Sequence, residues 1–151
     1  MKKRFGLTAV LLFIFIFLLS ACSSQDGGSN SGASGDSLPG SSLDNTFWTM
    51  TTMAKSRPLP GAEITAGFID GQLSGSTGCN NYFAAYETDG QRISLENAGV
   101  TEMACLDPDG VMDVESRFLD YFYQVERFHL TEDELQLITP DGEYLIFVPR
   151  P

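Results

Sequence analysis

The sequence of 151 residues has little of what catalysis at a metal or binding of nucleic acid usually requires. It contains one histidine and three cysteines, and its 9 lysine and arginine residues are outnumbered by 20 acidic residues. The net charge of −11 has the wrong sign for nucleic acid or an anionic lipid surface, so neither is expected as a partner. The sequence also lacks a phosphate-binding loop and a dinucleotide-binding fingerprint, and no cofactor is expected.

The N-terminus carries the one long apolar run. A basic stretch, MKKR, precedes residues 5–19, which contain no charge, and the run ends in the small residues Ser20 and Ala21. Its length is below the roughly 18 residues that a membrane-spanning helix needs, and the order of basic, apolar and small residues is that of a secretory signal. Residues 1–21 are therefore predicted to be a signal peptide.

The tetrapeptide LSAC, which ends at Cys22, resembles the lipobox of bacterial lipoproteins. The resemblance implies that the signal is cut before Cys22 and that the Cys22 thiol carries acyl chains such as palmitate. The protein would then be anchored to the outer face of the cell membrane, or to an outer membrane where the cell has one. The alternative is ordinary cleavage after Ala21, which would leave a free thiol.

The rest of the chain divides by composition into a linker and one small domain. Residues 22–45 are rich in serine and glycine, cannot bury apolar surface, and are predicted to be a flexible tether. Residues 46–151 suffice for a single domain. In that domain, Asp-Gly dipeptides at residues 70–71, 89–90 and 141–142 lie between strand-like runs, which predicts three hairpins. Residues 47–53 and 127–131 are further strand candidates.

One segment has helical periodicity instead. Apolar residues recur every three or four positions between Pro108 and Val125, and Asp107 is expected to cap the helix with Pro108 at its first position. Phe and Tyr in this stripe are expected in the core. The predicted fold class is α+β: a curved antiparallel sheet, built as a meander of hairpins, packed on one main helix.

Two motifs carry a resemblance to a known family. SGSTGCNNY, residues 74–82, and T-x-M-A-C, Thr101 to Cys105, are similar in order and separation to the META domain of HslJ-like bacterial envelope lipoproteins. The resemblance implies a disulfide between Cys79 and Cys105, one cysteine from each motif. Closing that loop of about 26 residues would restrict the unfolded chain by about 3.5 kcal/mol. The family has no established reaction, and its members are associated with envelope stress tolerance.

The sequence leaves two other kinds of chemistry open at the motif cysteine. Cys79 could act as a nucleophile with His129 as base and Asn80 as orienting group, but alternation in RFHL places His129 on the solvent face. Two cysteines and one histidine without C-x-x-C spacing do not make a closed zinc site. Asn80 and Asn81 are expected to hydrogen-bond the backbone where the strand bends.

An acidic segment near residue 110 has some of the acidic positions of a calcium loop. Its glycine and its twelfth position do not fit the calcium-binding pattern, and no metal ligand is predicted. The acids are better explained by their position at the N-terminus of the helix, where the helix dipole stabilises negative charge. The three residues concerned are Asp107, Asp109 and Asp113.

The sequence thus predicts an exported, lipid-anchored, monomeric and non-catalytic protein in cell-envelope maintenance or stress response, with an envelope protein as partner. One alternative is a specific binding module that holds a protein or an apolar ligand in a groove between helix and sheet. The other is a thiol-dependent hydrolase that uses Cys79.

Overall fold

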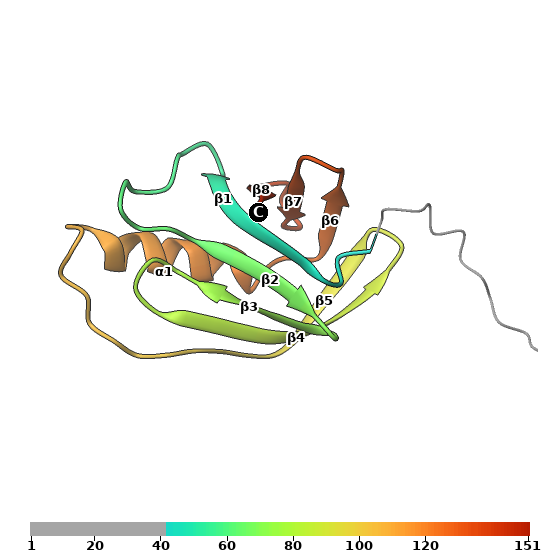
Figure 1. The fold of residues 1–151 in the computed structure, drawn as a ribbon, viewed down its shortest axis with the longest axis horizontal. Helices are drawn as coiled ribbons and strands as arrows, with labels where there is room; N and C mark the ends of the chain where they lie inside the picture. The colour runs from blue at the N-terminus through green and yellow to red at the C-terminus, as the bar shows by residue number, and fades with distance from the viewer. Residues whose placement is uncertain (1–41) are drawn as a thin grey trace, which may run out of the picture. The chain divides into compact units, whose positions relative to one another are not determined.

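The computed structural model describes residues 42–151, which form an antiparallel β-barrel with one helix. Each strand is antiparallel to the next, and the last strand pairs with the first. Figure 1 shows β6, β7 and β8 (red-brown) beside β1, and the long connection that leads from β5 to the helix. The elements in chain order are β1 Thr46–Met53, β2 Thr65–Ile69, β3 Gln72–Ser76, β4 Asn81–Asp89, β5 Arg92–Val100, α1 Val111–Phe122, β6 Arg127–Leu130, β7 Leu135–Ile138 and β8 Tyr144–Pro149.

The three hairpins predicted from Asp-Gly dipeptides are present. They join β2 to β3, β4 to β5, and β7 to β8. Gly71, Gly90 and Gly142 have φ values of 74°, 59° and 85°, the left-handed conformation that tight turns demand and glycine adopts without steric cost. Local turn chemistry therefore sets the order of neighbouring strands.

The predicted fold class is wrong in its architecture, because the sheet is closed and is not an open sheet packed on a main helix. Strand β1 pairs with β2 on one side and with β8 on the other, where Met50 lies opposite Phe147. Both of these side chains are buried inside the barrel. Closure removes the free edges that an open meander would leave and lets inward-facing side chains fill the interior.

The helix is shorter than predicted and contributes to the barrel core. It begins at Val111, follows Gly110, and has no side-chain cap, so the predicted cap by Asp107 is wrong. The rings of Phe118 and Phe122 are buried, with centroids 5.0 and 4.8 Å from that of Tyr82. The aromatic stripe is thus core, as expected, and these rings do not line an open groove. No helix within residues 42–151 is long and apolar enough to cross a membrane.

The connection between β5 and α1 receives little support from the sheet. Strands β5 and β6 pair only at Arg92 and Arg127, because the chain between them leaves the sheet to form residues 101–110 and then the helix. One backbone bond, from Thr101 N–H to the Asn81 carbonyl, continues from β5 into this connection. Residues beyond Thr101 must therefore be fixed by other interactions.

Candidate functional site

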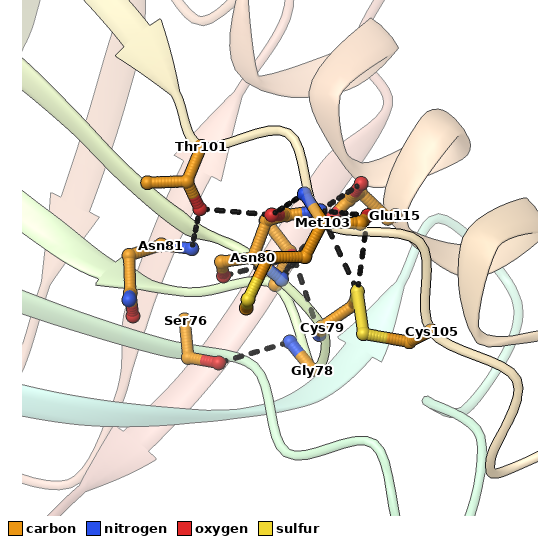
Figure 2. Close-up of a disulfide and its surroundings, with 10 residues drawn as sticks. Ser76, Gly78, Cys79, Asn80, Asn81, Thr101, Met103, Cys105 and Glu115 are labelled. Carbon is orange, nitrogen blue, oxygen red and sulfur yellow. Dashed lines mark hydrogen bonds between the residues drawn. A yellow bond between two sulfur atoms is a disulfide. The ribbon is translucent and has the colours of Figure 1, made fainter.

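The two sequence motifs meet at a disulfide. Cys79 lies in the turn between β3 and β4, Cys105 lies in the connection after β5, and the structure joins their sulfur atoms with a Cα–Cα distance of 5.8 Å (Figure 2). Neither residue carries a free thiol in this state. The nucleophile that a thiol-dependent hydrolase would need is therefore used as a cross-link.

The turn that carries Cys79 is stabilised by Thr77. The Thr77 N–H donates to the Asn80 carbonyl at 2.8 Å, and the buried Thr77 hydroxyl accepts from the Asn80 N–H at 2.9 Å. Gly78 has a φ of 96°, and a Cβ there would lie 2.8 Å from the Cβ of Ala62. The motif therefore needs glycine at this position for both conformation and space.

Asn80 is the centre of the site, with 1% of its surface exposed. Its Oδ1 accepts hydrogen bonds from the Thr101 hydroxyl at 2.8 Å and from the Met103 N–H at 2.7 Å. Its Nδ2 donates to the Met103 carbonyl at 3.1 Å and to Glu115 Oε1 at 2.9 Å. One side chain from the first motif thus holds the backbone of the second motif on both sides of Met103, as Figure 2 shows.

Glu115 is a third component that the sequence motifs do not include. It lies on α1 with only 6% of its surface exposed, and its Oε2 accepts from the Asn80 N–H at 3.1 Å and from the Thr77 hydroxyl. Sequence reasoning missed it, although a signal exists: Glu115 is four residues after Val111 and three before Phe118, both on the buried face. An acidic residue in an apolar helical stripe predicts a buried polar contact.

The structure places the two asparagines in different roles. Both were expected to bond the backbone, and the Asn80 side chain does so. Asn81 is exposed, and it takes part through its backbone, whose N–H donates to the Thr101 hydroxyl at 3.1 Å. Asn80 is therefore buried at the end of the turn, and Asn81 begins β4 with its side chain exposed.

Tyr82 anchors the start of β4 next to the site. Its ring packs over Gly75 of β3, and its hydroxyl donates a hydrogen bond to the Thr65 carbonyl of β2 at 2.7 Å. Burial raises the pKa of Tyr82 well above its usual value, because the charged phenolate would be desolvated. A Cβ at Gly75 would lie 1.9 Å from the same Thr65 oxygen, so the missing side chain makes room for this contact.

The histidine is not part of this arrangement. His129 lies on β6 with an exposed side chain and is paired with Gln136 of β7, while the neighbouring Phe128 is buried. No hydrogen bond within residues 42–151 joins His129 to Cys79 or Asn80. The structure therefore does not assemble a dyad of Cys79 and His129.

The acidic segment borders a small hollow. Asp109 and Asp113 line a space of about 220 Å³ together with Cys105, Leu106 and Met112. In the part of the chain that the structure describes, no group of three or more histidine, cysteine or acidic residues is arranged to hold a metal ion. The hollow is a surface feature next to the disulfide.

Comparisons with known proteins bear on the family and the fold. The family model of the META domain matches residues 41–151. An NMR structure of a protein from Burkholderia xenovorans superposes with a TM-score of 0.61 at 26% identity, covering 72% of this chain and 83% of that one. A second NMR structure shares the fold with a TM-score of 0.55 at 18% identity, covering 70% and 90%. A search of the curated proteins found no match to this chain.

Proposed function

The chain belongs to the META domain family, and from this premise we propose that it is a non-catalytic binding protein of the bacterial cell envelope, anchored through lipid on Cys22. The lipobox-like LSAC and the signal pattern before it support the anchor. Both lie outside the described residues. Residues 22–45 serve as the tether that lets the domain reach its partner.

One observation supports a binding role over a catalytic one: the polar groups of the motif are occupied in holding the protein together. Both motif cysteines are in the disulfide, and the side-chain oxygen and nitrogen of Asn80 each make two hydrogen bonds to neighbouring protein groups at 3.1 Å or less. Catalysis by acid, base or nucleophile needs a group that is free to meet a substrate. The motif instead fixes the shape of a surface segment, which is what a binding protein requires.

The process we propose is envelope maintenance under stress, in common with the HslJ-like lipoproteins that the two motifs resemble. A protein held at the membrane by acyl chains stays within a few tens of ångströms of the bilayer, given about 5–6 Å times the square root of the tether length. Its partner must therefore be another envelope component. We expect the protein to act as a monomer, because β1 and β8, which would be the free edges of an open meander, pair with each other.

The test combines chemistry with physiology. Intact mass of the protein extracted from membranes should correspond to a chain that begins at Cys22 and carries acyl chains, whereas Cys22→Ser should abolish acylation and membrane retention. A deletion strain should be more sensitive than wild type to envelope stress, and the wild-type gene should restore tolerance while Cys22→Ser should not. An unacylated wild-type chain would refute the anchor, and equal tolerance of the deletion strain under all stresses would refute the process.

A further inference from the structure

The segment fixed by Asn80 and the disulfide presents apolar side chains to solvent. Leu106 is 92% exposed, Met103 is 52% exposed, and Met112 at the start of α1 is 36% exposed. Leu106 and Met112 line the same hollow of about 220 Å³ beside Cys105. We call Leu106, Met112 and the hollow the Leu106 patch.

Exposure of these residues is not a consequence of a loose chain. The backbone N–H and carbonyl of Met103 are both bonded to the buried Asn80 side chain, at 2.7 and 3.1 Å. Cys105, directly before Leu106, is covalently tied to Cys79. The fold therefore presents Leu106 from a fixed position, and a partner would lose less conformational entropy on binding it than on binding a free loop.

The charged residues that line the hollow are of one sign. Asp109 and Asp113 line the hollow, and no basic residue is among the described residues that line it. The ion pairs found within residues 42–151 join Lys55 to Glu143 and Arg127 to Glu126, so neither aspartate takes part in one. Two further acids, Glu102 and Asp107, are exposed on the same segment.

From this combination we infer that the Leu106 patch docks a basic protein segment that inserts an apolar side chain into the hollow beside Leu106. Apolar surface supplies the contact area, and the acidic rim selects a cationic partner and speeds its approach. A second copy of this chain fits poorly, because it would bring two acidic rims together. The inference rests on the proposed binding function and names the surface and the chemistry of the partner.

The test uses methionine methyl groups as reporters. The mature lipoprotein, cleaved before Cys22 and anchored by its own acyl chains in nanodiscs of zwitterionic phospholipid, is labelled with ¹³C at the methionine methyls. It is titrated with an oligolysine peptide that has one central leucine. The signal of Met112, which lines the hollow, should move, while those of Met50 and Met53, which are buried in the barrel, should not.

Matched changes separate the apolar and ionic parts of the contact. Leu106→Ser, or serine in place of the peptide's leucine, should weaken binding by about tenfold or more, the equivalent of losing one buried aliphatic side chain. Asp109→Asn with Asp113→Asn should weaken binding several-fold and reduce its salt dependence. Ile69→Ser, which changes an exposed aliphatic residue on β2, should leave the affinity unchanged.

Several results would overturn the inference. These are the absence of a shift at Met112, equal binding of an oligoglutamate peptide with the same leucine, or an unchanged affinity for Leu106→Ser. Movement of the Met112 signal with protein concentration alone would assign the patch to a second copy and would equally reject the basic partner. If the peptide fails while acylation and stress tolerance behave as proposed, the envelope function stands and only this docking surface is lost.

Discussion

Replacing Asn80 with aspartate is the sharpest test of the polar centre, because it changes one NH₂ group into an oxygen and leaves the shape unchanged. In the wild type, Asn80 Nδ2 donates to the Met103 carbonyl at 3.1 Å and to Glu115 Oε1 at 2.9 Å. In Asn80→Asp, a carboxylate oxygen would face both of these acceptors. Two hydrogen bonds would be lost and two carboxylates would meet in a buried site.

We expect Asn80→Asp to lower the free energy of unfolding by about 3–5 kcal/mol at neutral pH, from the cost of buried groups without partners and of an uncompensated buried charge. That is a large part of the roughly 5–15 kcal/mol that stabilises a typical domain. Urea denaturation of wild type and variant measures the difference. Asn81→Asp is the matched control: the Asn81 side chain is exposed, and the change should stay within about 0.5 kcal/mol.

The cost should depend on pH with a definite sign. The folded variant holds two facing carboxylates, which raises the pKa of the introduced group above the value of about 4 that it has in the unfolded chain. One proton restores a donor between them, so the folded variant binds a proton that the unfolded chain releases. The deficit relative to wild type should therefore shrink as the pH falls from 7 toward about 4. A variant as stable as wild type, or a deficit that does not change with pH, would refute the role given to Asn80.

Three further predictions concern the frame around the site. Cys79→Ser and Cys105→Ser should each lower the free energy of unfolding by about 2–4 kcal/mol, and the double variant should lower it by no more than either one. Thermal unfolding measures the three values, and additive losses would mean that the two cysteines have separate roles. Tyr82→Phe should lower the free energy of unfolding by about 1 kcal/mol at neutral pH, because it removes the hydrogen bond to the Thr65 carbonyl. Above about pH 10 the wild type should lose stability, because Tyr82 ionises in the unfolded chain but not in the folded one, and Tyr82→Phe should lose less. Equal losses of stability in wild type and variant at alkaline pH would contradict this. Gly75→Ala should cost about 3 kcal/mol or more in urea denaturation, because the new Cβ meets the Thr65 carbonyl backbone; wild-type stability would show that the strands can separate there at little cost.

Local sequence signals predicted most of the strands, and non-local contacts explain what they missed. Asp-Gly turns identify hairpins because the turn and both strands are close in sequence. The pairing of β1 with β8 joins residues near 50 to residues near 147, and nothing at either end of the domain marks the other as its neighbour. The predicted open sheet was wrong for this reason, whereas its strands and their neighbours along the chain were found.

The candidate site was predicted only in part, again because its contacts join residues that are far apart in the sequence. The resemblance supplied the pairing of Cys79 with Cys105, and the structure contains that disulfide. Turn chemistry gave Asn80 a backbone-bonding role, but its partners lie more than 20 residues away along the chain, and sequence alone did not name them. Glu115 was missed because the prediction of the helix rested on its apolar positions alone, although one acidic residue lies among them. The predicted anchor at Cys22 and the tether of residues 22–45 stay predictions.

Amide hydrogen exchange at Met103 tests most directly whether the motif fixes the segment after β5. Met103 belongs to no strand or helix and has an exposed side chain, yet its N–H donates to the buried Asn80 Oδ1 at 2.7 Å. The account predicts a Met103 amide that exchanges far more slowly than those of Glu102 and Ala104, and that loses its protection in Asn80→Ala. Exchange as fast as at these two neighbours would show that the segment is not held, and would contradict the central claim.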